Sequence, residues 1–428
     1  MQNTLLTYPY PHHQQQQSQH HHHHHHSPHH QQQHPISHSH RYQRNNYKLN
    51  KSSSLSSYTS RYPLYATDWS FQNNTSRILL SSYQEDSTNK IQVVYGTLNN
   101  NLSLSESTDP IDSINSISSS SISSTSSSNT NSSSSNSHLY PFWNFNNKSS
   151  DCSVKYPVSR VQWDPSMNNE RFATTSECLR IYEVDHSSPL GTNIIERAKL
   201  FNSKNLSTNQ LPPMTSFDWN KTNPTDLITC SIDTTCTVWN LTKETYSAKT
   251  QLIAHDNVVY DVKYIFGDSN IFSSCSADGS VRLFDLRNLE QSTIIYESTN
   301  NSKLVRLSTC NYNANQIAVL QQDSNEIIIL DLRNISLPIY KLSNHSSTVN
   351  SIAWHPSKNI LLTGSDDCQA FIYNFELHSQ NNDFNVSNKD LLPVSKYSTD
   401  SEINYVCWSP NGEWAGLTSG TQFQSCIV

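Results

Sequence analysis

Glycine is scarce in this chain, with only 8 among 428 residues. Loops that cradle phosphate groups need glycine for close backbone approach, and no G-x-x-x-x-G-K-[ST] segment occurs. The chain also lacks G-x-S-x-G and H-E-x-x-H, the signatures of common hydrolases and zinc proteases. Asn, Asp and Ser must supply many turns, which their side chains allow. We expect no enzyme activity, no catalytic residues, no metal, no cofactor and no small-molecule substrate.

Cysteine is present but forms no C-x-x-C pair, and the nine residues are odd in number. They therefore indicate small buried hydrophobic residues in a reducing compartment rather than disulfides or zinc ligands. No apolar run approaches transmembrane length, and the N-terminus lacks the apolar core of a signal peptide. We expect a protein of the nucleus and cytoplasm that does not bind membranes.

Hydrophobic residues make up only 34% of the chain, an average over two kinds of sequence. Residues 1–60 are rich in His, Gln and Ser, and residues 99–137 are rich in Ser and Asn. Such segments bury too little apolar area to offset the entropy of ordering, so we predict that both are disordered. The seven-His run at 20–26 is interpreted as part of this low-complexity field rather than as a metal site.

Charge is divided unevenly along the chain. Residues 1–67 hold five basic residues and no acid, which leaves 23 basic and 35 acidic residues, a net charge of −12, for the rest. Nucleic-acid binding needs a positive surface for the phosphates. We therefore expect no direct binding of nucleic acid by the remainder of the chain.

The remaining sequence repeats with a period of about 45 residues. A turn Asp recurs at Asp233, Asp278, Asp323 and Asp367, and an apolar residue recurs at Trp239, Phe284, Leu330 and Tyr373. This is the length of a WD repeat, a four-stranded blade that must stack on neighbours. We predict an all-β, seven-bladed WD40 propeller over residues 61–428, with first-strand markers at Trp69, Trp163, Trp219, Tyr264, Cys310, Trp354 and Trp408. A strand within 45–60 is expected to close the ring.

In a WD blade, a His before the first strand, a Ser or Thr in the second, the turn Asp and a third-strand Trp form a hydrogen-bonded chain. We predict such structural networks for three blades: His255, Ser274 and Asp278; His345, Thr363 and Asp367; and Thr229, Asp233 and Trp239 without a His. A catalytic reading of His255 and Asp278 is disfavoured because the same set recurs on the repeat period.

Long insertions at 99–150, 185–210 and 378–396 each follow a predicted third strand. They should therefore lie mostly on one rim of the ring, in loops that tolerate insertion. The opposite rim, formed by the turns around His255 and Asp278, should keep short loops. We expect that rim to be the protein-docking surface.

Several phrases, among them SIDTTCTVWNL (231–241), KTQLIAHDNVVYDV (249–262) and ADGSVRLFDLR (277–287), resemble one WD-repeat adaptor family. It comprises the Transparent Testa Glabra proteins of plants and the cullin-four-associated factor seven, or WD-repeat protein sixty-eight, of animals. The resemblance implies a non-catalytic scaffold that binds transcription regulators and protein kinases of the dual-specificity tyrosine-regulated type.

The same resemblance implies an alternative role as a substrate receptor of cullin-four ubiquitin ligases. Phe284, Asp285 and Arg287 fit the WDxR box that contacts the ligase linker, and Asp331 with Arg333 forms a poorer second copy. Each Asp–Arg pair has a purely structural alternative, an exposed ion pair that adds little stability.

Overall fold

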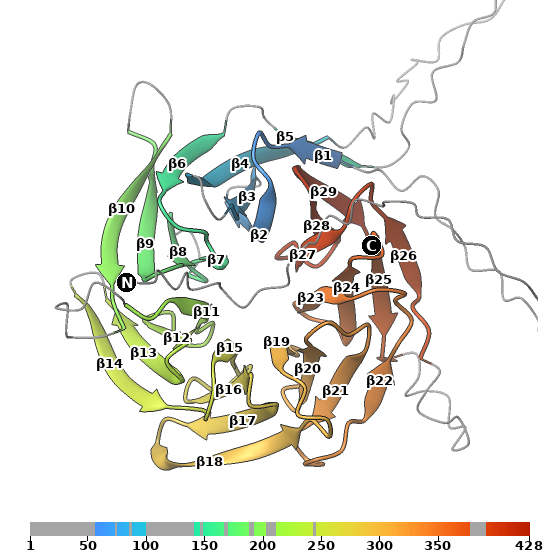
Figure 1. Cartoon of the computed structure of the whole chain (residues 1–428). Coiled ribbons are helices and arrows are strands. Elements are labelled where there is room, and N and C mark those ends of the chain that lie inside the picture. Colours follow the sequence, from blue (N-terminus) through green and yellow to red (C-terminus); the bar gives the residue numbers. More distant parts are fainter. Residues whose placement is uncertain are drawn as a thin grey trace, which may run out of the picture.

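The computed structural model describes residues 56–428, apart from 73–74, 85–87, 100–140, 146–148, 167–169, 188–191, 203–210, 243–244 and 377–390. Seven antiparallel sheets stand around a central channel (Figure 1), which confirms the predicted seven-bladed propeller. The disorder predicted for 1–60 and 99–137 falls almost wholly outside the described residues. Among those described, no helix is long and apolar enough to cross a membrane.

Each blade places its first strand at the channel and its fourth at the periphery, and we number the blades along the chain. Blade 1 contains β2 (Leu64–Gln72), β3 (Thr75–Ser82), β4 (Asn89–Asn99), β5 (Phe142–Phe145) and β6 (Ser150–Val154), where β5 and β6 pair with successive halves of β4. Blade 2 contains β7 (Arg160–Trp163), β8 (Arg171–Thr175), β9 (Leu179–Asp185) and β10 (Asn193–Leu200). Blade 3 contains β11 (Met214–Trp219), β12 (Asp226–Ser231), β13 (Thr235–Leu241) and β14 (Tyr246–Ile253).

The later blades follow the same order. Blade 4 contains β15 (Val259–Tyr264), β16 (Ile271–Ser276), β17 (Ser280–Asp285) and β18 (Asn288–Glu297). Blade 5 contains β19 (Leu304–Thr309), β20 (Gln316–Gln321), β21 (Ile327–Asp331) and β22 (Tyr340–Leu342). Blade 6 contains β23 (Val349–Trp354), β24 (Ile360–Ser365), β25 (Gln369–Asn374) and β26 (Ser395–Ser398), and blade 7 contains β27 (Ile403–Trp408), β28 (Trp414–Ser419), β29 (Gln422–Ile427) and β1 (Ser56–Thr59).

Strand β1 closes the ring by pairing antiparallel with β29, the last strand of the chain. It lies inside the predicted range 45–60, so the described propeller begins at Ser56 rather than at 61. Beyond the strand, the backbone N–H groups of Ser60 and Leu64 donate to the carbonyls of Thr421 (2.8 Å) and Gly420 (2.7 Å). The closing strand thus leaves blade 7 and leads directly into blade 1.

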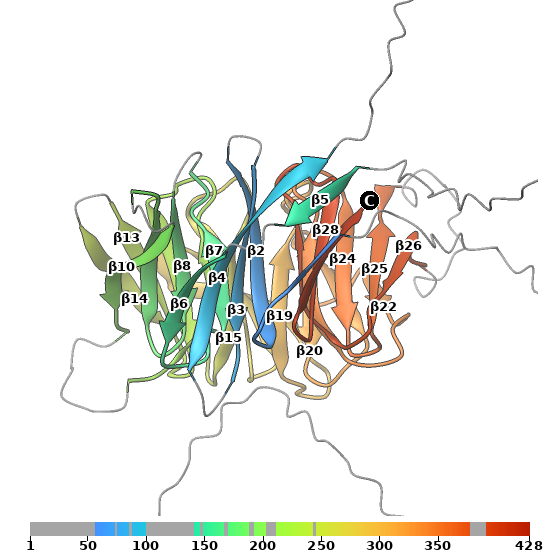
Figure 2. The same ribbon diagram turned by 90° about the horizontal axis from the view of Figure 1, so that it is seen from above.

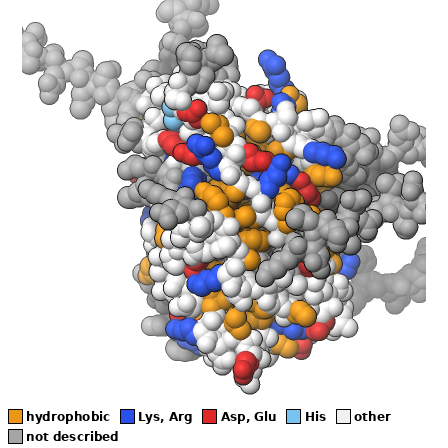
Figure 3. Space-filling model, turned by 90° about the vertical axis from the view of Figure 1, so that its left-hand side faces the viewer, with side chains coloured by type: hydrophobic (Ala, Val, Ile, Leu, Met, Phe, Trp, Pro, Cys, Tyr) orange, Lys and Arg blue, Asp and Glu red, His pale blue; other side chains and the backbone are white. Residues whose placement is uncertain are grey.

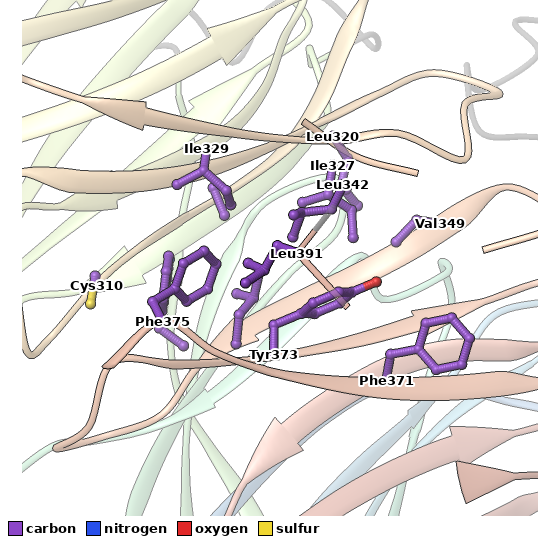
Figure 4. Packing of buried hydrophobic residues seen from close by; sticks show 13 residues of the cluster. Cys310, Leu320, Ile327, Ile329, Leu342, Val349, Phe371, Tyr373, Phe375 and Leu391 are labelled. Atoms are coloured by element: carbon purple, nitrogen blue, oxygen red, sulfur yellow. The ribbon is translucent and has the colours of Figure 1, made fainter. Parts of the chain in front are cut away.

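The hydrophobic core is divided among the interfaces between blades. Seven buried clusters occur, and each is formed mainly by two neighbouring blades. Figure 4 shows the one between blades 5 and 6, where Ile327 and Ile329 face Tyr373 and Phe375. The alternating side chains of each strand therefore serve two different cores, because neither face of a blade is exposed to solvent.

The predicted markers end the first strand in five blades and lie within β2 in blade 1, but blade 5 requires a correction. There β19 ends at Thr309, and Thr309 pairs with Ile317 as Tyr264 pairs with Phe272 in blade 4. The marker is therefore Thr309 and not Cys310. A hydroxyl side chain occupies a position that is aromatic elsewhere, and the adjacent buried Cys310 fitted the apolar pattern better.

Strand direction defines two rims (Figure 2). Rim 1 carries the turns between first and second strands and the loops between third and fourth strands; rim 2 carries the remaining turns and the connections between blades. The predicted insertions lie largely outside the described residues, but the strands that flank them, β4 and β5, β9 and β10, and β25 and β26, are joined on rim 1. However, β10 (Asn193–Leu200) lies within the predicted insertion 185–210, and its connection to β11, which begins only at Met214, joins two blades and so belongs to rim 2. The expectation that rim 2 keeps only short loops was therefore wrong.

Because β1 supplies the last strand of blade 7, its removal should open the ring. We expect deletion of residues 1–59 to lower the melting temperature by roughly 10 °C or to give insoluble protein, since it exposes β29 and removes the buried Tyr58. Deletion of residues 1–50, which spares β1, is the matched control and should leave melting unchanged. Equal melting of the two truncated proteins would contradict closure by β1.

Candidate functional site

The predicted network of blade 4 is present. His255 Nδ1 lies 2.9 Å from Asp278 Oδ2, and His255 Nε2 lies 2.7 Å from Ser274 Oγ. The imidazole is completely buried, and Asp278 also accepts from the backbone N–H of Asp256. Phe284 cannot extend the chain and instead stacks on Phe272, with ring centroids 4.9 Å apart. The set joins the loop before β15 to the turn after β16.

Blade 6 repeats this arrangement. His345 Nδ1 lies 2.9 Å from Asp367 Oδ2, and His345 Nε2 lies 2.8 Å from Thr363 Oγ1. The imidazole stacks on Phe371 at 4.1 Å between centroids. Tyr373, which stands in the Trp position, donates its hydroxyl to Asn344 rather than to the network.

Blade 3 reaches a similar result without His. Trp239 Nε1 donates to Thr229 Oγ1 at 2.9 Å, while Asn202 Nδ2 donates to Asp233 Oδ2 at 2.8 Å. Asn202 lies two residues after β10, as His255 lies two residues after β14. Sequence reasoning missed Asn202 because it sought a His, although its distance from the outer strand was the available signal.

The electrostatics of these networks fit a structural role. Burial by itself would raise the pKa of Asp278, but hydrogen bonds from His255 and Ser280 and the charge of His255 hold it well below its usual range. The pKa of Asp367 is likewise lowered, against burial, by hydrogen bonds from Ser346 and His345. Burial lowers the pKa of His345 despite the neighbouring Asp367. The Asp side chains are thus kept ionised as fixed acceptors within the turns.

The proposed linker-contact residues separate into buried and exposed groups. Phe284 is buried in the core between blades 3 and 4, so it cannot meet a partner. Arg287 follows β17 on rim 1, with Nε and Nη2 donating to Asp285 at 2.8 and 2.6 Å. In blade 5, Arg333 donates in the same way to Asp331 at 2.9 and 2.6 Å.

The channel wall carries a feature that the sequence did not reveal. In three successive blades, the residue before the marker accepts a hydrogen bond from the backbone N–H of the next blade's marker. These bonds run from Trp163 to Asp68 (2.7 Å), from Trp219 to Gln162 (3.1 Å) and from Tyr264 to Asp218 (3.0 Å). Polar side chains thereby join the first strands of blades 1 to 4 around the channel.

Two further links lie deeper in the channel. Asp261 Oδ2 accepts from the backbone N–H of Leu307 (3.2 Å), and Ser351 Oγ accepts from that of Val406 (3.1 Å). Both acceptors lie three residues before their markers. Because both acceptors occupy the same position of the repeat, the two links are equivalent contacts between the first strands of neighbouring blades.

The His networks generate a stability prediction. We expect His345→Ala to lower the free energy of unfolding by about 2–3 kcal/mol, because Asp367 and Thr363 lose a buried partner and Phe371 loses its stacked ring. His186→Ala, at a side chain 46% exposed, is the control and should change it by less than about 0.5 kcal/mol. Urea unfolding measures both. Equal effects would show that the network adds no stability.

A second prediction concerns Asp68. Burial raises its pKa from 3.8 to about 6, so the folded chain binds this proton more tightly than the unfolded chain does. Ionisation therefore costs stability above pH 6, and the cost disappears as the pH falls towards 4. We expect Asp68→Asn to stabilise the protein by about 2 kcal/mol at pH 7.5 and hardly at all at pH 4. A variant destabilised at pH 7.5 would show that the ionised carboxylate is favourable.

The comparison with known proteins agrees with the geometry. The family WD domain, G-beta repeat matches residues 247–285 and 336–374. Each match contains one outer strand followed by the first three strands of the next blade, β14 to β17 and β22 to β25. These are also the two segments that contain the complete His, Ser or Thr, and Asp sets.

Three relatives extend the similarity. The chain is 32% identical to the WD repeat-containing protein YPL247C of Saccharomyces cerevisiae, over 88% of this chain and 77% of the relative. It is 34% identical to the uncharacterized WD repeat-containing protein C17D11.08 of Schizosaccharomyces pombe, over 52% and 55%. It is 35% identical to the DDB1- and CUL4-associated factor 7 homolog of Dictyostelium discoideum, over 86% and 96%. The chain therefore belongs to the WD-repeat family of DDB1- and CUL4-associated factor 7.

Proposed function

We propose that this protein is a non-catalytic scaffold whose rim 1 contacts the DDB1 linker of a cullin-four ubiquitin ligase. The relative from Dictyostelium is named for association with DDB1 and CUL4, and 96% of its length is covered by the match. The observation that carries the proposal is the pair of exposed arginines, Arg287 and Arg333, in adjacent blades.

The two arginines are prepared for binding by the same local geometry. The side chains of Arg287 and Arg333 are 57% and 68% exposed, so each presents donors to solvent. Each guanidinium is nevertheless fixed by two hydrogen bonds to an Asp two residues earlier. Because this pairing restricts the side-chain rotamers before binding, less conformational entropy is lost when a partner docks. Because an exposed ion pair adds little to the free energy of folding, we infer that these pairs serve binding.

A second candidate function is the docking of protein kinases and transcription regulators, which the family resemblance implies. Its structural support is the charge of rim 2. Among the described residues, the turns and connections of that rim carry ten acidic residues, Glu177, Asp233, Asp256, Asp278, Asp323, Glu326, Asp366, Asp367, Asp400 and Glu402, and three basic ones, Arg61, Lys155 and Lys303. Three bases of the adjoining strands, Arg180, Arg282 and Lys341, pair with Glu177, Asp256 and Glu326, which leaves an acidic excess. A surface of one sign favours partners with complementary basic segments. The two candidate functions would then use opposite rims, in the nucleus and cytoplasm.

One pull-down from the native cell tests both functions. With tagged full-length protein, we expect Arg287→Ala with Arg333→Ala to abolish DDB1 recovery while kinase recovery is retained. The free energy of unfolding should change by less than about 1 kcal/mol, because both side chains are exposed. Arg197→Ala removes another exposed Arg, paired with Glu183 on the outer face of blade 2, and should leave both partners bound.

The outcomes separate the candidates. Undiminished DDB1 recovery with the double variant would contradict the linker contact, and recovery of kinases without any DDB1 would favour the second function. Figure 3 shows the face that bears the outer strands at the left of Figure 1, where hydrophobic side chains mix with charges of both signs.

A further inference from the structure

The central channel holds a cavity of about 690 Å³. First strands and first turns of all seven blades line it, so the cavity opens on rim 1. Its volume lies within the range of known ligand sites. The Asp–Arg pairs of the proposed DDB1 contact do not line it.

Hydrophobic residues surround the mouth of this cavity at one repeated position. The residue two after each marker lines it in every blade, and we name these seven residues the collar: Phe71, Pro165, Lys221, Phe266, Asn311, Pro356 and Pro410. Five of the seven are Phe or Pro. Phe266 is 46% exposed, and Lys221 is the single charged member, also exposed. The collar is therefore mainly apolar with one basic side chain, and polar turn residues such as Ser166, Thr222 and Asn411 line the cavity beside it.

Three basic side chains, Arg160, Lys263 and Arg306, gather around Asp261 deeper in the channel, which Asp68 and Asp218 also line. Lys263 Nζ lies 3.4 Å from Asp261 Oδ1, and Arg160 Nη1 lies 3.9 Å from the same atom. Arg306 donates to the hydroxyl of Tyr65 at 3.0 Å. Although burial favours the neutral acid, the charges of Lys263, Arg160 and Arg306 lower the pKa of Asp261 to about 2. All three bases therefore act on Asp261, and the charge of Arg160 also acts on Asp68.

The carboxylate of Asp261 also accepts hydrogen bonds from other groups. Asp261 accepts hydrogen bonds from Ser216 Oγ (2.7 Å) and from the backbone N–H groups of Val262 and Leu307. The buried Nε of Arg160 has no acceptor among the described residues. Lys263 is also 3.6 Å from Asp218, but burial and the charge of Arg160 still lower its pKa. An anion beside Arg160 would therefore meet an unused hydrogen-bond donor, and the positive charges of Lys263 and Arg306 act at the same depth.

We propose that this channel binds a short, extended, acidic segment of a partner protein, inserted from rim 1. Apolar side chains of the segment pack against the collar, and its carboxylates meet Lys221 at the mouth and Arg306, Lys263 and Arg160 further in. The collar and Arg160 are separated by five strand positions, ~16 Å. A chain end or loop tip spans that depth, whereas a single side chain does not. The inference goes beyond the linker contact and is independent of it.

A phage-displayed library of random nine-residue peptides, selected on the full-length protein, provides the probe. We expect enriched peptides to combine Asp or Glu with aromatic or aliphatic residues. A synthetic fluorescent copy of the most enriched peptide should bind Lys221→Glu and Arg306→Gln at least tenfold more weakly in an anisotropy titration. Lys358→Glu reverses an exposed charge on rim 1 outside the collar and should change the affinity less than twofold.

Thermal melting of each variant distinguishes lost binding from lost folding, and Lys221 is exposed enough that its reversal should leave the fold intact. Enrichment of basic peptides, enrichment of none, or binding unaffected by Lys221→Glu would overturn the proposal. The Arg287→Ala, Arg333→Ala protein should bind the peptide normally. The experiments thus distinguish a failure of the channel proposal from a failure of the DDB1 contact.

Discussion

The structure depends on one constraint: no blade can bury both of its faces alone. Every hydrophobic cluster is built mainly from two adjacent blades, so each blade needs a neighbour on both sides. A linear stack would leave two apolar faces in water, whereas a closed ring leaves none. Closure in turn requires the two ends of the chain to meet, and β1 achieves this by completing blade 7 before the chain enters blade 1.

Polar side chains supplement the apolar interfaces in two places, beside the channel and on rim 2. Near the channel, the links from Asp68, Gln162 and Asp218 fix the height of each first strand relative to the next. On rim 2, the His255 and His345 sets fix turns instead. Because glycine is scarce, other residues must adopt positive φ in the tight turns. Thr234 and Cys368 have φ values of 71° and 61° at the position that Gly279 occupies in blade 4. A non-glycine residue is strained there, so the networks hold turns that local preference does not favour.

Periodicity in the sequence predicted the blades because it records which side chains face the cores. It predicted the sets around His255 and His345 because those residue types are themselves the signal. Thr309 was not predicted as the marker of blade 5 because backbone pairing with Ile317 fixes the strand end, while the Thr309 side chain departs from the repeat. Asn202 was not predicted because its side-chain amide, rather than an imidazole, is the donor to Asp233. The channel links depend on contacts between blades, which no single repeat encodes.

The same architecture explains how one rigid ring can offer several independent surfaces. The Asp–Arg pairs lie at the end of third strands on rim 1, the acidic turns lie on rim 2, and the channel is lined by first strands. Each surface uses strand positions that the cores do not need, since Arg287 and Arg333 are exposed while their neighbours Phe284 and Leu330 are buried. Substitutions on one surface therefore need not disturb the others. A scaffold that assembles several partners requires this separation, and the blade repeat supplies it through the alternation of side chains along each strand.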